Sequence, residues 1–181
     1  QNEGVSYRTG ADPAIVRHKG AYYLFQTLAD GYWRSTDLID WTFITPSRWP
    51  FEGIVAPAVA SDGDRLILMP SISFNRPNSI LVSAAPETGK LDFLVRRLPH
   101  LPGGVDKPAT EMKPGEVPPG PWDPGLFKDD DGQWYLYWGS SNVFPIYGQK
   151  IAFEDGKLIY QTRAEPLFNL QPDLHGWERF G

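Results

Sequence analysis

The 181-residue chain contains no cysteine, so disulfides and cysteine-ligated metal sites are excluded and the redox compartment stays open. It also lacks any apolar run approaching the roughly 20 residues of a membrane-spanning helix. Basic residues are in deficit, because 17 Lys and Arg stand against 22 Asp and Glu, a net charge of −5. Nucleic acid and anionic lipid both select basic surfaces, so we expect neither nucleic acid nor membrane as a partner.

Sustained helical periodicity is a further absence, and 18 Pro with 18 Gly argue against long helices. Asp-Gly pairs recur instead, at residues 30–31, 62–63, 131–132 and 155–156. An Asp-Gly pair between apolar stretches favours a β-hairpin, because the turn needs positive φ. The sequence therefore predicts a single all-β domain over residues 1–181.

A short phrase centred on proline occurs three times, at residues 11–16 (ADPAIV), 56–60 (APAVA) and 122–127 (WDPGLF). Each copy is followed at nearly the same offset by an apolar stretch: YYLF, LILM or WYLYW. Asp12 and Asp123 precede the proline in the first and third copies, whereas Ala56 takes this place in the second. The repeat predicts equivalent structural units, two of which carry a carboxylate at the same position.

Each unit is expected to contain four strands. The predicted strands cover residues 14–17, 22–27, 32–35 and 41–44; then 58–61, 66–71, 80–84 and 91–95; then 125–128, 134–139, 149–153 and 157–159. Four antiparallel strands at this spacing are typical of β-propeller blades, here about 11–45, 55–96 and 122–160. Residues 99–121 are predicted to form an irregular loop, either a pocket rim or a flexible insertion. A β-sandwich is the alternative, but it leaves the repeated phrase unexplained.

Propeller geometry places the first-strand entrances on one face, so Asp12 and Asp123 are expected at its central mouth. Hydrolysis of a glycosidic bond needs two carboxyl groups across the bond, roughly 6.5–9.5 Å apart in inverting enzymes. Alternatively, each Asp-Pro pair is only turn chemistry before a strand.

Aromatic rings and polar side chains on the same face are candidate sugar contacts. Aromatic residues make up 14% of the chain. Because the chain has a net negative charge, aromatic rings outside the core are expected to stack on sugars rather than on nucleic-acid bases. Pockets for such ligands combine ring faces with a few polar groups. The predicted substrate-binding residues are Trp49, Phe74, Asn75, Trp122, Ser141, Asn142 and Phe144.

Taken together, these phrases resemble glycoside hydrolase family 43. The resemblance rests on ADPAIV and YYLF in the first unit, STDLIDW at residues 35–41, VAP at 55–57 and WDPGLF at 122–127, and it covers nearly the whole chain. It implies a five-bladed β-propeller, of which about three four-stranded blades are present here. It also implies an inverting enzyme that acts on arabinosyl, xylosyl or galactosyl glycans.

The resemblance also implies site roles. Asp12 would be the general base that activates water, and Asp123 would orient the general acid and modulate its pKa. Two features depart from the family pattern: Ala58 stands where Asp is frequent, and the acid's Glu-Gly-Pro or Glu-Gly-Ala phrase is absent from the chain. Glu111, Glu116 and Glu178 lie in other contexts, so the acid is expected beyond Gly181.

The missing glutamate supports an alternative function, a carbohydrate-binding propeller without catalysis. A protein-interaction propeller is a third possibility, but it would not need paired carboxylates. In each of the first two cases the expected partner is a carbohydrate, and the expected location is secreted or periplasmic.

The histidines do not suggest a metal site. His18 is expected to be solvated in a hairpin of the opposite face, and His100 and His175 lie in loops without a partner at ligand spacing. We therefore predict no metal ligands in this chain and no required cofactor. The resemblance allows a central calcium ion, held mainly by water and a histidine of a later blade.

Overall fold

The computed structural model describes residues 10–49, 54–71, 79–105, 107, 111–113, 116–117, 120–139, 145–169 and 171–178. These residues contain 13 strands and one short 3-10 helix, η1 (Pro86–Thr88). Among them, no helix has the length and apolar character needed to cross a membrane. The prediction of an all-β fold is confirmed.

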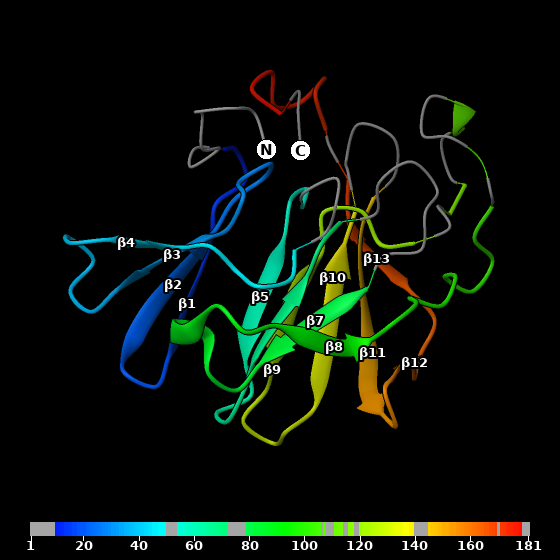
Figure 1. The fold of residues 1–181 in the computed structure, drawn as a ribbon. Helices are drawn as coiled ribbons and strands as arrows, with labels where there is room; N and C mark the ends of the chain where they lie inside the picture. Colours follow the sequence, from blue (N-terminus) through cyan, green and yellow to red (C-terminus); the bar gives the residue numbers. More distant parts are fainter. Residues whose placement is uncertain are drawn as a thin grey trace.

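The strands form three antiparallel sheets that lie side by side in chain order (Figure 1). The first sheet contains β1 (Ala14–His18), β2 (Ala21–Phe25), β3 (Tyr32–Ser35) and β4 (Thr42–Ile44). The second contains β5 (Ala58–Ser61), β6 (Leu66–Met69), β7 (Ile80–Ser83) and β8 (Asp92–Val95). The third contains β9 (Gly125–Lys128), β10 (Trp134–Trp138), β11 (Ile146–Glu154) and β12 (Lys157–Tyr160). Within the described residues, the sheets do not close into a ring.

A thirteenth strand, β13 (Glu165–Phe168), joins the third sheet and was missed by the sequence prediction. It pairs with the first part of β11, whereas β12 pairs with the last part. All four residues of β13 are exposed and one is proline, so no alternation of apolar and polar residues marks the strand. β11 begins at Ile146, earlier than predicted, because its first residues pair with β10 and β13.

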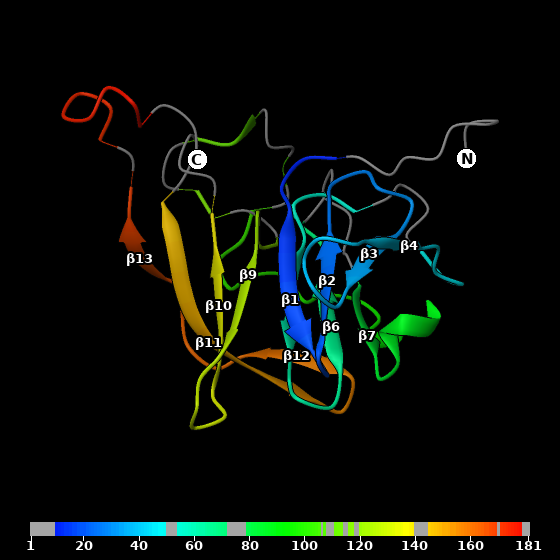
Figure 2. The ribbon, with the colours of Figure 1, turned by 90° about the vertical axis from the view of Figure 1, so that its left-hand side faces the viewer.

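The first strand of each sheet lies at the centre of the structure. β1 contacts β5 and β5 contacts β9, so the three first strands stand next to one another. Figure 2 shows β1 and β9 in this central position. The sheets extend outwards from this line, and β8 meets β12 further out. Loops that enter first strands therefore gather at one end of a common axis, and the hairpins that leave them gather at the other.

The middle sheet is buried on both faces along its inner strand β6. Every residue of β6 is buried, with Leu66 and Leu68 packed toward the first sheet and Ile67 and Met69 packed toward the third. Since side chains alternate along a strand, four consecutive apolar residues supply two separate cores. The first core also includes Tyr23, Phe25, Tyr32 and Leu81, and the second includes Ile80, Leu136, Trp138 and Ile151.

The outward faces of the first and third sheets remain exposed. Ile15 on β1 is 53% exposed, Phe127 on β9 is 49% exposed and Tyr137 on β10 is 38% exposed. β2 alternates between buried and half-buried residues, as expected for a strand with one core face.

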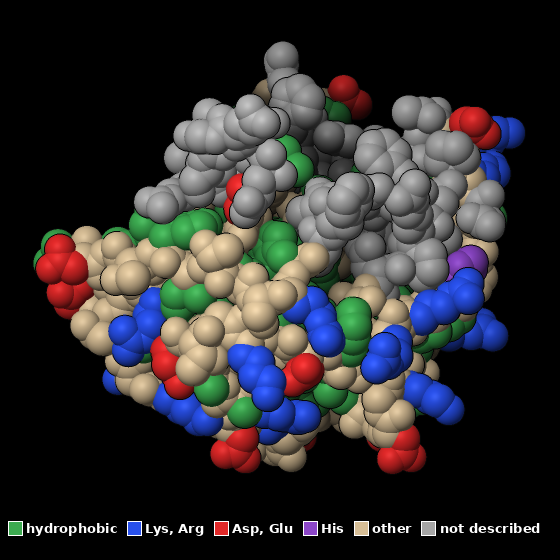
Figure 3. All heavy atoms as spheres, in the orientation of Figure 1, with side chains coloured by type: hydrophobic (Ala, Val, Ile, Leu, Met, Phe, Trp, Pro, Cys, Tyr) green, Lys and Arg blue, Asp and Glu red, His purple; other side chains and the backbone are tan. Residues whose placement is uncertain are grey.

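Cationic side chains cover part of the outer strand β8, on the side drawn in Figure 3, where lysine and arginine are interspersed with acidic and apolar groups. The guanidinium carbons of Arg48 and Arg96 lie 5.0 and 5.1 Å from the centre of the Phe93 ring. Such stacking keeps the charge in water while the ring is shielded by the side chain.

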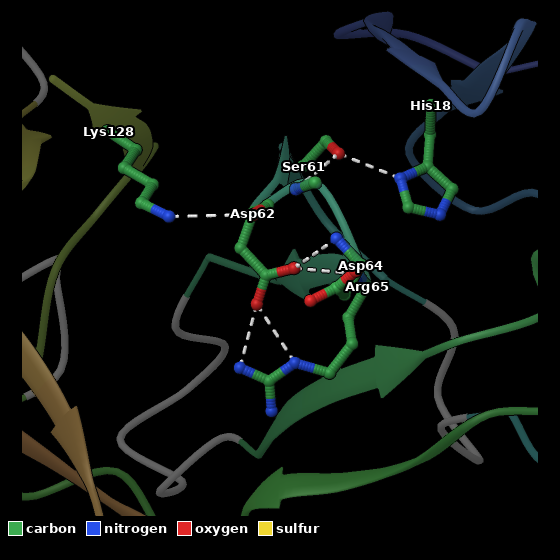
Figure 4. A network of polar contacts seen from close by, with 7 residues as sticks. His18, Ser61, Asp62, Asp64, Arg65 and Lys128 are labelled. Atoms are coloured by element: carbon green, nitrogen blue, oxygen red, sulfur yellow. Dashed lines mark hydrogen bonds and ion pairs between the residues drawn. The ribbon is translucent and has the colours of Figure 1, made fainter. Parts of the chain in front are cut away.

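A polar network joins the sheets at their hairpin end (Figure 4). His18 Nδ1 lies 2.7 Å from the Ser61 hydroxyl oxygen, and Lys128 donates to the Asp62 carbonyl at 3.5 Å. His18 is only 2% exposed, so the prediction that it is solvated is wrong. Burial lowers the pKa of His18, and the neighbouring Lys19 charge lowers it further, against the opposing effect of Asp62 and Glu87.

This burial makes stability sensitive to acid. A histidine with a lowered folded-state pKa favours the folded state above the unfolded value of about 6.5 and loses that contribution as pH falls below it. The free energy of unfolding, measured by urea denaturation, should therefore fall between pH 7.5 and pH 5.5. His18→Asn should reduce this fall, whereas the matched change at exposed His100, His100→Asn, should leave it intact. An equal fall in His18→Asn and the unaltered chain would contradict the assignment.

Candidate active site

The repeated phrase has a distinctive backbone conformation. Asp12, Ala56 and Asp123 each stand directly before a proline and have positive φ values of 50°, 36° and 45°. Positive φ is uncommon outside glycine, and a following proline further restricts the backbone. Three equivalent outliers show that the sequence repeat is also a structural repeat, in which each of these entrance residues turns the chain into the first strand.

The same backbone hydrogen bond closes each entrance. A residue shortly after the second strand donates its N–H to the carbonyl that precedes the entrance residue. The three bonds run from Thr27 to Ala11 at 2.9 Å, from Ser71 to Val55 at 2.8 Å, and from Gly139 to Trp122 at 2.8 Å. Because β1, β5 and β9 are neighbours, these bonds place Asp12 and Asp123 at the same end of the axis.

Asp12 is held by a hydroxyl group. The Thr27 hydroxyl donates to Asp12 Oδ2 at 2.6 Å and accepts the backbone N–H of Ala56 at 2.8 Å. Within the described part of the chain, the other carboxylate oxygen of this exposed residue has no hydrogen-bond donor. Oδ1 is therefore the oxygen available to a proton from solvent or substrate.

Asp123 lies in a different electrostatic environment. Its backbone N–H donates to the Ser71 hydroxyl oxygen at 3.0 Å, and that hydroxyl donates to Asp123 Oδ1 over a longer 3.4 Å. Partial desolvation raises the pKa of Asp123, and the negative charge of Asp12 raises it further, while the Ser71 hydrogen bond lowers it. The charge of Asp12 is therefore close enough to influence the ionisation of Asp123.

Two predicted sugar-binding rings fall within the described residues. Trp49 donates its indole N–H to the Ala29 carbonyl at 2.9 Å, and its ring lies 6.1 Å from that of Tyr32. Trp122 packs against the core between the second and third sheets. Part of each ring thus stabilises the fold, and a role in substrate binding stays a prediction. The other predicted contacts, Phe74, Asn75, Ser141, Asn142 and Phe144, lie outside the described residues.

Two of the glutamates considered as general acids have structural partners. Glu116 forms an ion pair with Lys107, and its Oε2 accepts the backbone N–H of Lys113 at 2.9 Å. Glu178 accepts the backbone N–H of Gln171 at 2.8 Å. These contacts explain both side chains as stabilisers of local loops, and the identity of the acid stays a prediction.

The described residues contain no cluster of three His, Asp or Glu side chains that could hold a metal ion. They do not by themselves form the calcium site that the resemblance allows, and no chemical step is derived through a metal.

Thr27 and Ser71, whose hydroxyls contact the two carboxylates, were not predicted from the sequence. A signal was available, since both hydroxyl residues stand at the same distance after the proline of their units. The third unit has Gly139 near this position, so the pattern covers only two of three copies.

Comparison with known proteins identifies the fold. No protein-family model and no curated protein sequence matches the chain. Among solved structures, it is similar to an α-L-arabinofuranosidase from Clostridium thermocellum, with 23% identity and a TM-score of 0.58 over 87% of this chain and 55% of that one. A similar match is an exo-β-1,3-galactanase from Clostridium thermocellum, with 17% identity and a TM-score of 0.58 over 87% and 39%.

A glycoside hydrolase family 43 arabinoxylan arabinofuranohydrolase from Bacillus subtilis also matches, with 18% identity and a TM-score of 0.55 over 92% of this chain and 42% of that one. The chain therefore has the fold of these glycoside hydrolases and spans about half of their length or less.

The raised pKa of Asp123 predicts that this carboxylate destabilises the fold. A carboxyl group with a raised folded-state pKa keeps its proton to higher pH in the folded state, so its ionisation opposes folding above the unfolded value of 3.8. Asp123→Asn should raise the urea midpoint at pH 7, and the difference should vanish near pH 3, where the carboxyl is protonated in both states. Asp130→Asn, at an exposed turn residue, is the control and should leave the urea midpoint unchanged at pH 7. A lower midpoint for Asp123→Asn at pH 7 would count against an electrostatic penalty at this position.

Proposed function

We propose that this chain is part of a family 43 glycoside hydrolase that cleaves arabinosyl, xylosyl or galactosyl linkages with inversion. The observation that carries this proposal is the pair of carboxylates at equivalent entrances, which share a backbone conformation and lie close enough for the charge of Asp12 to raise the pKa of Asp123. The similarity to solved arabinofuranosidase and galactanase structures supports the substrate class.

In the proposed reaction, Asp12 is the general base. Because Thr27 occupies Oδ2, Oδ1 takes a proton from a water molecule as that water attacks the anomeric carbon. The bond from this carbon to the leaving oxygen breaks with its electron pair, and a glutamic acid gives its proton to that oxygen. Asp123 orients the glutamic acid and, when ionised, adjusts its pKa.

We further propose that the complete propeller has five blades. The exposed apolar side chains on the outward faces of the first and third sheets, Ile15, Phe127 and Tyr137, support this architecture because further blades would cover them. Ring closure would also surround the axis on which Asp12 and Asp123 lie.

The absence of a glutamate in the expected phrase favours one rival, a propeller that binds carbohydrate without cleaving it. A screen of p-nitrophenyl α-L-arabinofuranoside, β-D-xyloside and β-D-galactoside separates the two. Release of nitrophenol supports the hydrolase. Saturable binding of arabinose or xylose without release from any of the three supports the rival.

Replacing the proposed base tests the mechanism. In the complete enzyme, Asp12→Asn should lower kcat by about 10²-fold or more, because an amide cannot accept the proton of the attacking water. Binding, measured by calorimetry with unhydrolysed oligosaccharide, should persist. The anomer formed first by the unaltered enzyme should be inverted, as followed by proton NMR. Full activity of Asp12→Asn would exclude Asp12 as the base, and a retained anomer would exclude single displacement.

A further inference from the structure

Two hydroxyl groups connect the carboxylates to the backbone of neighbouring sheets. Thr27 lies after β2 in the first sheet, and its hydroxyl oxygen accepts the N–H of Ala56, the entrance residue of the second sheet. Ser71 lies after β6 in the second sheet, and its hydroxyl oxygen accepts the N–H of Asp123, the entrance residue of the third sheet. The same contact therefore occurs twice, each time between one sheet and the next.

The bond to Ala56 fixes the direction of the Thr27 hydroxyl. Since the amide can only donate, the oxygen of Thr27 is the acceptor at 2.8 Å, and its hydrogen remains available for Asp12 Oδ2 at 2.6 Å. A second backbone bond, from Leu28 N–H to the Ile54 carbonyl at 2.8 Å, holds the same two loops together. The entrance of the second sheet thereby orients the carboxylate of the first.

Ser71 repeats this arrangement with one change. Its own sheet has Ala56 at the entrance and offers no carboxylate, so its hydroxyl instead reaches Oδ1 of Asp123 in the next sheet. Gly139, in the corresponding place of the third sheet, has no hydroxyl, and a Cβ atom there would lie 2.3 Å from the Pro145 carbonyl oxygen. Close backbone approach therefore excludes such a contact at the third position.

We propose that Thr27 and Ser71 are positioning residues, which use the amide of the next sheet's entrance to aim a hydroxyl at Asp12 and Asp123 respectively. The proposal rests on the proposed function for its catalytic consequence, but the hydrogen bonds themselves can be tested without substrate. The packing of each sheet against the next places the two hydroxyls, and the hydroxyls in turn orient the two carboxylates.

Thr27→Val tests the first contact, because valine keeps the shape and removes the hydroxyl. The amide of Ala56 should then exchange with solvent at least about tenfold faster by NMR, because it loses its acceptor. With the nitrophenyl glycoside that the enzyme cleaves, kcat should fall about tenfold while KM changes little. Thr27→Ser should restore most of both properties, and Thr42→Val, at the exposed first residue of β4, is the matched control.

Ser71→Ala tests the second contact. The carboxyl of Asp123, followed by carbon-13 NMR, should titrate at higher pH, because the hydroxyl opposes the increase in its pKa. The amide of Asp123 should also exchange faster. Ser83→Ala is the matched control, since Ser83 is buried at the end of β7 and its hydroxyl bonds local backbone, the Lys90 carbonyl and the Ala85 N–H.

The outcomes separate this proposal from the proposed function. If no glycoside is cleaved by the unaltered enzyme, the hydrolase assignment fails, while the exchange and titration measurements still decide the role of the hydroxyls. The positioning role is overturned if Thr27→Val leaves Ala56 exchange or kcat unchanged, or if Thr27→Ser is as impaired as Thr27→Val. It is equally overturned if Ser71→Ala shifts the Asp123 titration no more than Ser83→Ala does.

Discussion

The backbone hydrogen bond that closes each sheet at its entrance is the contact on which the site depends. It ties the residue before Asp12, Ala56 or Asp123 to the chain that leaves the second strand. With that bond made, the entrance residue adopts positive φ and the following proline leads directly into the innermost strand. Since the innermost strands are neighbours, a local bond repeated three times becomes a common rim around one axis. The carboxylates acquire their shared location from this rim and need no contact with each other.

Packing between sheets and chemistry at the rim are joined through the hydroxyls. The middle sheet fills two cores with the alternating residues of β6, which fixes its place relative to both neighbours. Thr27 and Ser71 then span the same two interfaces at the rim. Both carboxylates belong to exposed residues, but their environments differ: Asp12 accepts a short bond from Thr27, whereas Asp123 has only a longer bond from Ser71 and a pKa raised by desolvation and by the charge of Asp12. Carboxyl groups in unlike environments can serve unlike roles in acid–base chemistry.

Much of this architecture could be predicted from sequence. Apolar stretches bounded by Asp-Gly turns located the strands of all three sheets, and the proline-centred phrase indicated that Asp12 and Asp123 are equivalent. The prediction failed where tertiary contacts override local pattern. β13 has no buried face and is held by its pairing with the first part of β11, and His18 is buried where its ring meets Ser61 of the next sheet. The equal spacing of Thr27 and Ser71 after their prolines could have indicated the two hydroxyl residues but not their partners, because the contacts join residues 29 and 52 positions apart.

Ala56 shows that the entrance conformation belongs to the fold, because this residue adopts positive φ without a carboxylate side chain. An alanine at φ 36° lacks the local side-chain hydrogen bonds that help aspartate tolerate this region, so its conformation costs on the order of 1 kcal/mol. The structure keeps this conformation even where no carboxylate is present. The entrance geometry is therefore a requirement of turning the chain into the inner strand, and it would exist in a propeller without catalysis. Aspartate at two of the three entrances adds negative charge to a backbone conformation that also forms without it. At Asp123 desolvation and the charge of Asp12 both raise the pKa, so ionisation of this carboxyl works against stability, and perturbed carboxyl groups of this kind are more frequent at functional sites than elsewhere.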